Sequence, residues 1–222
     1  PDPEFRLTFL KQHPYLDFLV IDGGEEPFSE LLSWWNDGSQ DYDQLPQNIA
    51  WREGNKIITS GERPLKKIIE NIPSPYLGGY LDEFLEAGMV PMLESNRGCP
   101  YKCTFCKLNF QKTLQRSAES VVNEFAEIAA LGITEIEVYD DTFTWSPKRV
   151  QEICRGLLER KIDIQWAIRD RVNGVREENL DLLRQAGCKR IHLGVESGSE
   201  KTLKTIKKHT KLPQIRRAVE LV

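Results

Sequence analysis

Three cysteines in one short run are the residues of this chain best suited to chemistry. Cys99, Cys103 and Cys106 lie in the segment RGCPYKCTFC, where the spacing CxxxCxxC puts three thiols within one loop. A structural zinc site normally has four protein ligands, but the next cysteine is Cys154, on a predicted helix. Three soft sulfur ligands with an open fourth position suit an iron–sulfur cubane, which can bind an outside ligand at one iron. A zinc-binding or redox-active cysteine loop is the alternative.

The region around and after the cysteines alternates between predicted strands and predicted helices. The predicted strands are 90–94, 133–139, 162–168 and 189–195. The predicted helices begin at Ser117, Ser146, Glu177, Ser199 and Pro213, where serine caps or early prolines precede apolar positions of helical spacing. Gly132 and Gly187 are helix-stop signals. Repeated strand–helix units predict parallel strands, with functional loops at their C-terminal ends.

The earlier part of the chain has a different character. Residues 16–21 are a short apolar strand, and a helix over 27–35 follows a glycine turn, with Pro27 at its first position. This order is typical of the last unit of a doubly wound sheet. The apolar residues expected on one face of this helix are Phe28, Leu31, Leu32 and Trp35. A hairpin is predicted over 49–59, and residues 1–5 are set aside as a cloning remnant.

Composition restricts the function classes. The 222 residues carry 30 basic and 34 acidic side chains, a net charge of −4, with no basic block that would favour nucleic acid as a partner. No apolar run has the length of a membrane span, and no signal-peptide pattern is present. Five cysteines, three of them clustered, fit a reducing cytosol better than a disulfide scaffold, so we expect a cytoplasmic protein.

The cysteine run resembles the signature of the radical S-adenosylmethionine (radical SAM) superfamily, CxxxCxΦC, and Phe105 fills the aromatic position. The resemblance implies a [4Fe–4S] cluster on Cys99, Cys103 and Cys106, whose open iron chelates the amino and carboxylate groups of SAM. In that superfamily, one electron from the cluster then splits SAM into methionine and a 5′-deoxyadenosyl radical. The resemblance also implies an α/β partial parallel barrel. Only about four of its strand–helix units are found, so the chain looks like a segment of a longer protein.

The resemblance assigns SAM contacts to polar residues at the strand ends. Asp140 would accept a hydrogen bond from the SAM amino group. Asp141 is its alternative, although it could equally cap a turn. Arg169 follows the third strand, and its two-pronged guanidinium would hold the SAM carboxylate or an acidic substrate. With Phe105, these are candidate cofactor-binding residues.

The fourth strand ends at the sequence GVESG, which resembles a family motif whose glutamate contacts the ribose or amino end of SAM. Glu196 is therefore a candidate cofactor-binding residue, with Ser197 second. A buried carboxylate without a partner would be costly, so we expect Glu196 to have a hydrogen-bonding partner. Gly194 and Gly198 would let the backbone approach the ligand closely.

Other conspicuous residues have simpler structural explanations. Cys154 is expected to be a small apolar core residue, Cys188 to begin the fourth strand, and His192 to be a hydrogen-bonded core histidine. Arg171 is expected to form a surface ion pair. The residues expected to pack in the core are Trp34, Trp35, Trp51 and Trp166. A solvated basic helix face is expected from Lys204, Lys207, Lys208, His209 and Lys211.

The segment from His13 to Phe28 resembles the end of the cobalamin-binding domain that precedes many radical SAM cores, although its DGGE departs from the family pattern, roughly DFVVxGEGE. The resemblance implies three parts: residues 1–60 as the C-terminal part of a Rossmann-like cobalamin-binding domain plus the hairpin, 61–88 as a linker with a short helix at 81–87, and 89–222 as the N-terminal portion of the partial barrel. Cobalamin is then a third expected cofactor.

We interpret the chain as part of a cobalamin-type radical SAM enzyme. Methyl transfer to an unactivated carbon is the commonest outcome in that subfamily, and rearrangement or ring formation are alternatives. A methylthiotransferase-like enzyme is a second interpretation, but those carry three further cysteines in an N-terminal domain, and none precedes Cys99. A non-catalytic metal-binding module is a third. The expected partners are a small, natural-product-like substrate and an electron donor such as flavodoxin or ferredoxin.

Overall fold

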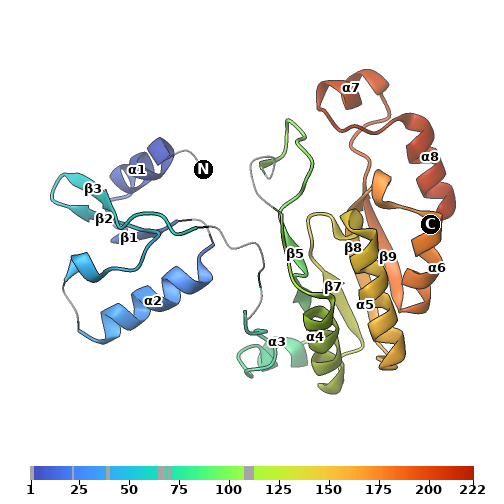
Figure 1. Ribbon diagram of the computed structural model, residues 1–222, viewed down its shortest axis with the longest axis horizontal. Coiled ribbons are helices and arrows are strands. Elements are labelled where there is room, and N and C mark those ends of the chain that lie inside the picture. Colours follow the sequence, from blue (N-terminus) through green and yellow to red (C-terminus); the bar gives the residue numbers. More distant parts are fainter. Residues whose placement is uncertain (1–2, 22, 39–40, 65–68, 70–71, 108–112) are drawn as a thin grey trace. The chain divides into compact units, whose positions relative to one another are not determined.

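The computed structural model describes residues 3–21, 23–38, 41–64, 69, 72–107 and 113–222. The chain divides into two compact units, residues 1–65 and residues 66–222 (Figure 1). Each unit has its own hydrophobic core. Among the helices of the described ranges, none combines the length and the apolar character that crossing a membrane requires.

The first unit is a three-stranded antiparallel sheet with two helices. Its strands, in the order β1-β2-β3, are β1 (Phe18–Val20), β2 (Ile49–Glu53) and β3 (Lys56–Thr59). Its helices are α1 (Pro3–Gln12), α2 (Glu25–Asn36) and the 3₁₀ turn η1 (Tyr42–Gln44). The predicted hairpin is confirmed as β2 and β3, which turn at Gly54, whose φ of +56° favours glycine. Residues 3–5, set aside above, form the first turn of α1.

Helix α2 begins two residues before the predicted start and buries a different face. Leu31 and Trp34 pack into the core with Trp51 of β2. Phe28, Leu32 and Trp35 are exposed instead, so the predicted packing of these three residues is wrong. The helix has apolar residues on more than one side, and only the sheet that it meets decides which of them are buried. In the described strands β1 pairs antiparallel with β2, so the origin of this unit in a parallel Rossmann sheet stays a prediction.

The predicted linker is partly a structural element of the second unit. Its short helix is confirmed as α3 (Asp82–Glu86), and residues 65–68 and 70–71 lie outside the described ranges. Tyr76 is buried, and its hydroxyl accepts from the backbone N–H of Met92 at 2.8 Å and donates to the Met92 carbonyl at 3.0 Å. The second half of the linker is therefore fastened to an edge strand of the second unit's sheet.

The second unit is built on a four-stranded parallel sheet, as predicted. Its strands, in the order β4-β7-β8-β9, are β4 (Met92–Leu93), β7 (Glu135–Val138), β8 (Gln165–Arg171) and β9 (Cys188–Gly194). A two-stranded antiparallel ribbon, β5 (Asn96–Arg97) and β6 (Leu114–Gln115), brackets the cysteine segment and was not predicted.

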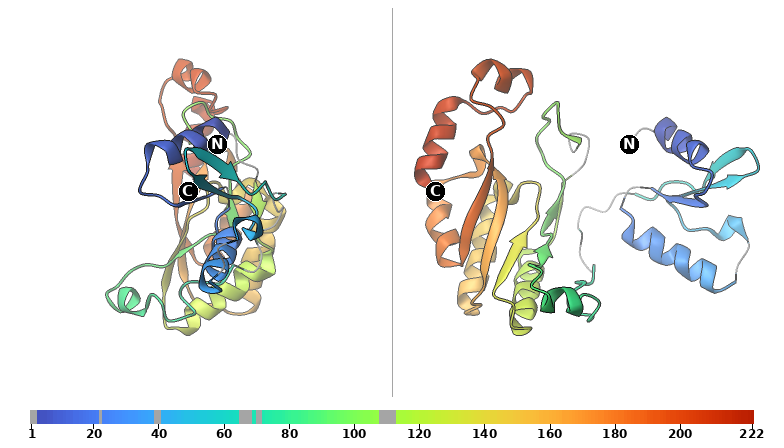
Figure 2. Two further views of the ribbon diagram at one scale, coloured as in Figure 1. Left: turned by 90° about the vertical axis from the view of Figure 1, so that its left-hand side faces the viewer. Right: turned by 180° about the vertical axis from the view of Figure 1, so that it is seen from behind.

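Helices α4, α5 and α6 pack side by side on one face of this sheet (Figures 1 and 2). The helices of the unit are α4 (Ala118–Ala130), α5 (Pro147–Glu159), α6 (Glu177–Gln185), α7 (Glu200–Thr205) and α8 (Leu212–Leu221), with the 3₁₀ turns η3 (Phe143–Trp145) and η4 (Val172–Gly174). The buried Trp166 of β8 lies at the centre of the core, with its ring centroid 5.6 Å from that of Phe125 and 5.5 Å from that of Phe143. Cys154 is fully buried, as predicted, and burial raises the pKa of its thiol to about 12.

Strand β8 continues three residues beyond its predicted end, and this extension decides the position of the site. Residues 169, 170 and 171 read as a polar loop, yet they pair with His192, Leu193 and Gly194 of β9. Two of them, Asp170 and Arg171, are buried. Polar side chains therefore project from a rigid strand end rather than from a loop.

The helix-start signals at Ser117 and Ser199 and the helix-stop signals are confirmed by local geometry, whereas Ser146 stands at the start of α5 without a side-chain cap hydrogen bond. The hydroxyls of Ser117 and Ser199 accept hydrogen bonds from the N–H groups of Ser120 and Thr202, which would otherwise lack partners in the first helical turns. Gly132 and Gly187 end α4 and α6 with φ of +82° and +95°.

These two glycines give a matched stability test. A Cβ on Gly187 would lie 2.3 Å from the carbonyl oxygen of Ile164, whereas a Cβ on Gly132 would meet nothing within 4 Å. We expect Gly132→Ala to cost about 1 kcal/mol, from the left-handed backbone alone, and Gly187→Ala about 3 kcal/mol, because strain and a clash with backbone add. Urea unfolding monitored by circular dichroism measures both, and equal losses would contradict the clash.

Candidate metal and cofactor site

A cavity of about 370 Å³ lies where the ends of β8 and β9 meet the cysteine segment. The side chains that line it are Cys99, Tyr101, Cys103, Phe105, Cys106, Asp141, Thr142, Arg169, Asp170, Arg171, His192, Leu193, Glu196 and Lys208, with the backbone of Gly194. The structure thus brings together the three cysteines, Phe105, Arg169 and Glu196. Asp140 and Ser197 are not part of the lining.

The cysteine segment is held in place by backbone hydrogen bonds at several points. The N–H of Gly98, a residue with φ of +84°, donates to the Asp141 carboxylate at 2.8 Å. The Sγ of Cys99 lies 3.2 Å from the Thr142 hydroxyl. The N–H of Thr104 donates to the carbonyl of Ile206, just after α7, at 3.0 Å. Segments far apart in the sequence therefore fix the position of the thiols.

The donor set fits an iron–sulfur cluster. All five cysteines are free thiols, and three of them face one cavity. Within the described ranges, no three Cys, His, Asp or Glu side chains converge closely enough to hold a single metal ion. A cluster makes a different demand, because each thiolate binds a separate iron atom and the sulfurs must surround a volume rather than a point.

Glu196 has a hydrogen-bonding partner, as the sequence analysis predicted, but this partner is Lys208, which had been assigned to a solvated helix face. Its carboxylate accepts from the ammonium of Lys208 at 2.8 Å. The Lys208 side chain is only 5% exposed, so its place on a solvated basic face is wrong. Glu196 has a φ of +66°, which is uncommon outside glycine. A Cβ on Gly194 would lie 3.0 Å from both charged groups, whereas a Cβ on Gly198 would meet nothing within 4 Å. The close approach of a ligand to the backbone at these two glycines stays a prediction.

Arg171 is the residue that sequence reasoning missed most clearly. It is buried, and its Nη1 donates to the Sγ of Cys103 at 3.1 Å. Its Nη2 donates to the Lys208 carbonyl, and its guanidinium lies 3.9 Å from the centroid of the Tyr101 ring. The predicted surface ion pair is wrong because β8 carries Arg171 inward to the cavity.

Two other strand residues line the cavity in different ways. Arg169 is about half exposed, pairs with Glu137 at 3.1 Å and has its guanidinium 4.0 Å from the centroid of the Tyr139 ring. His192 is exposed on the cavity wall, so its predicted place in the core is wrong. Arg169 lines the cavity, as expected for a residue at the end of the third predicted strand, and its predicted role in holding a carboxylate stays a prediction.

Comparisons with known proteins agree with this geometry. A family profile described as the Radical SAM superfamily matches residues 93–222, more than half of the chain. The chain belongs to the radical SAM superfamily. The matched region includes all three cavity cysteines and the strands β7, β8 and β9 of the parallel sheet.

Relatives of this radical SAM chain extend the similarity into the first unit. It is 30% identical over 205 residues to the uncharacterized methyltransferase PH0819 of Pyrococcus horikoshii, a match that covers 90% of this chain and 44% of that protein. It is 28% identical to the anaerobic magnesium-protoporphyrin IX monomethyl ester cyclase of Rubrivivax gelatinosus, over 96% of this chain and 40% of that protein. The chain thus spans less than half the length of these relatives.

A solved structure gives the same result for the fold. The radical SAM chain matches OxsB, described as a cobalamin-dependent S-adenosylmethionine radical enzyme with aqua-cobalamin and S-adenosylmethionine bound. The TM-score is 0.76 at 27% identity, over 97% of this chain and 32% of OxsB. The α/β fold with a parallel sheet is therefore that of a radical SAM core.

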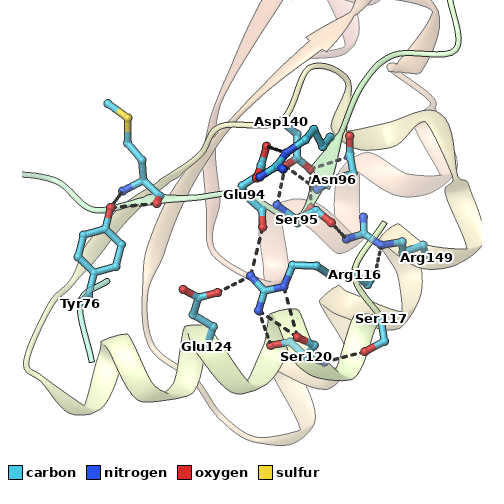
Figure 3. Close-up of polar contacts among 12 residues, drawn as sticks. Tyr76, Glu94, Ser95, Asn96, Arg116, Ser117, Ser120, Glu124, Asp140 and Arg149 are labelled. Carbon is cyan, nitrogen blue, oxygen red and sulfur yellow. Dashed lines mark hydrogen bonds and ion pairs between the residues drawn. The ribbon is translucent and has the colours of Figure 1, made fainter. Parts of the chain in front are cut away.

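Asp140 holds the residues that precede the cysteine segment of this radical SAM core (Figure 3). Its buried carboxylate accepts from the N–H groups of Ser95 and Asn96 at 2.7 and 2.9 Å and from the Asn96 side-chain amide at 2.7 Å. The Ser95 hydroxyl donates to it as well. Burial raises the pKa of Asp140 to about 6, against the opposing effect of these hydrogen bonds. Asp140 is not among the residues that line the cavity, and its predicted contact with SAM stays a prediction.

Two arginines extend this support network (Figure 3). Arg149 is buried and donates to the carbonyls of Ser95 at 2.7 Å and Arg116 at 3.0 Å. Arg116 donates to the Glu94 carbonyl at 3.1 Å and pairs with the carboxylate of Glu124 on α4. Ser197, the second candidate of its motif, instead accepts from the Ser199 N–H at 3.1 Å and shapes the turn before α7.

The Asp140 network predicts a stability effect. Asp140→Asn places an amide N–H₂ among donors, so we expect a loss of about 2 kcal/mol of unfolding free energy at pH 7. The exposed Asp163→Asn is the control and should change little.

The same variant has a predicted pH dependence. The folded-state pKa of about 6 lies above the ordinary 3.8, so the folded protein binds this proton more tightly. The contribution of Asp140 to stability is full below about pH 4 and is lost as the pH rises through 6. Urea titrations should therefore show the gap between wild type and Asp140→Asn narrowing from pH 4.5 to 7, and a gap that widens would contradict the assignment.

Proposed function

We propose that this chain is the cofactor-binding part of a radical SAM enzyme, with the [4Fe–4S] cluster on Cys99, Cys103 and Cys106. The observation that carries the proposal is that these three thiols share one cavity with the Glu196–Lys208 pair at the ends of parallel strands. Bound at these thiols, a reduced cluster supplies the electron that cleaves SAM reductively. The remaining steps depend on how the cavity holds SAM.

The cavity offers charges of both signs to a zwitterionic ligand. The Glu196 side chain is 35% exposed, and only one of its carboxylate oxygens is bound by Lys208. The other oxygen is available to accept a hydrogen bond from the SAM amino group. Asp141 replaces Asp140 as the candidate at the end of β7, because it is Asp141 that faces the cavity. Arg169 is the candidate for the SAM carboxylate, since a planar guanidinium can hold Glu137 and a second carboxylate at different edges. Phe105 is 54% exposed and offers an aromatic wall.

Methyl transfer with cobalamin is the reaction class we propose for the whole protein, acting on a small-molecule substrate with an external electron donor. It is supported by the methyltransferase name of the Pyrococcus relative and by OxsB, each similar over at least 90% of this chain. In this proposal residues 1–60 belong to a cobalamin-binding domain, residues 61–88 connect it to the core, and residues 89–222 begin the partial barrel. The packing of Tyr76 shows that part of this connection belongs to the core.

The Rubrivivax cyclase favours ring formation as a second candidate reaction. Methyl transfer and ring formation can be distinguished by the SAM-derived products that the full-length enzyme releases. Methyl transfer from SAM leaves S-adenosylhomocysteine, whereas ring formation through a SAM-derived radical leaves 5′-deoxyadenosine without it. S-adenosylhomocysteine that appears in proportion to product supports methyl transfer.

The cluster assignment is tested by anaerobic reconstitution. We expect about four irons and four sulfides per wild-type chain, and an electron paramagnetic resonance spectrum of the reduced protein that changes when SAM is added. Cys103→Ala should lose most of the iron. Cys154→Ala, which removes a buried thiol outside the cavity, should keep it. Stoichiometric zinc in the wild type, or equal iron in both variants, would overturn the proposal.

The role of Glu196 is tested by SAM affinity at full cluster loading. Glu196→Gln keeps the shape but removes the charge, and a charge-assisted hydrogen bond is worth about 1.5–3 kcal/mol, so SAM should bind roughly tenfold or more weakly. Glu135→Gln, which breaks the exposed ion pair with Arg190, is the control. Titration of SAM against the cluster spectrum measures both variants, and unchanged affinity in Glu196→Gln would remove this residue from the SAM site.

A further inference from the structure

Arg171 is a buried cation directed at a sulfur. Arg171 is 5% exposed, and its Nη1 lies 3.1 Å from the Sγ of Cys103. Its Nε is buried and has no hydrogen-bond partner within the described residues. A buried guanidinium is costly unless it is paired. The direction of its hydrogen bond therefore indicates where an anion belongs.

The other cations of the cavity lining already have carboxylate partners. Arg169 pairs with Glu137 at 3.1 Å and Lys208 with Glu196 at 2.8 Å. Over the described ranges, Arg171 forms no such ion pair. The buried Asp170 carboxylate interacts with it only at longer range, and the side-chain hydrogen bonds of Arg171 go to a sulfur and a carbonyl. The Tyr101 ring beneath it, 3.9 Å from centroid to guanidinium carbon, compensates only part of the desolvation.

We infer that Arg171 is a positioning residue of the cluster, which fixes the sulfur of Cys103 and stabilises the reduced cluster with its positive charge. The inference rests on the proposed function. Reduction adds one negative charge to the cluster, so a nearby fixed cation and an N–H···S hydrogen bond favour the reduced form over the oxidised form. Arg171 thereby raises the reduction potential of the cluster and makes the electron easier to accept.

The contacts of Arg171 also link the cluster side of the cavity to the SAM side. Its Nη2 donates to the carbonyl of Lys208, whose ammonium holds Glu196. A second hydrogen bond joins the same two segments: the N–H of Thr104 donates to the carbonyl of Ile206 at 3.0 Å. The segment 206–208 is thus fastened to the cysteine segment at two points, and one of them is the Arg171 side chain.

The experiment is a redox titration of the reconstituted protein, followed by electron paramagnetic resonance. Arg171→Gln should shift the midpoint potential of the cluster to more negative values by about 59 mV, which corresponds to a tenfold change in a one-electron equilibrium. Arg171→Lys, which keeps the charge but not the forked geometry, should fall in between. Arg190→Gln, an exposed arginine of the neighbouring strand, is the matched control and should leave the potential unchanged.

The outcomes separate this inference from the proposed function. A wild-type protein that binds zinc or no cluster overturns the function, whereas a normal wild-type cluster with an unchanged potential in Arg171→Gln overturns only the inference. If Arg171→Gln does not retain iron, its thermal unfolding temperature distinguishes a positioning role from a purely structural one. Loss of iron at an unchanged unfolding temperature, with recovery in Arg171→Lys, supports a positioning role. Loss of iron together with unfolding of both variants shows that Arg171 serves the fold alone and overturns it.

Discussion

The buried carboxylate of Asp140 fixes where the cysteine segment begins. Asp140 stands directly after β7, in the middle of the sheet, and it gathers hydrogen bonds from both Ser95 and Asn96. Asp141 then takes the N–H of Gly98, one residue before the first cysteine. Burying a carboxylate costs free energy that only a full set of donors offsets, so the segment has few alternative positions. The geometry of the thiols depends on this pair of aspartates.

The opposite end of the site is held by a different part of the chain. Strand β8 delivers Arg171 to the sulfur of Cys103, and the segment after α7 accepts the N–H of Thr104 and a hydrogen bond from Arg171. The cavity is therefore assembled from four stretches that are distant in sequence: the cysteine segment, the end of β7, the end of β8 with the facing end of β9, and residues 206–208. Parallel strands make this assembly possible, because all of their C-terminal ends meet at one edge of the sheet.

Features that depend on neighbouring residues could be predicted from the sequence, and those that depend on distant partners could not. Ser117, Ser199, Gly132 and Gly187 act within one turn of a helix, so their types alone predicted the helix ends. The cysteine spacing likewise predicted that three thiols would share a site. Arg171 and Lys208 were misread because a charged residue is normally solvated, and nothing local revealed the sulfur, the ring and the carboxylate that receive them.

Strain and charge concentrate at the same point of the cavity. Glu196 is held at a φ of +66°, a conformation that costs a non-glycine residue about 1–2 kcal/mol and persists only where its surroundings determine it. The hydrogen bond from the Lys208 ammonium holds the Glu196 side chain in place. Gly194 leaves room for both groups, since a Cβ there would be 3.0 Å from each. A carboxylate oriented before the ligand arrives needs no reorganisation when a positive amino group binds. In the proposed function, the strained backbone at Glu196 is the cost of a preorganised binding group.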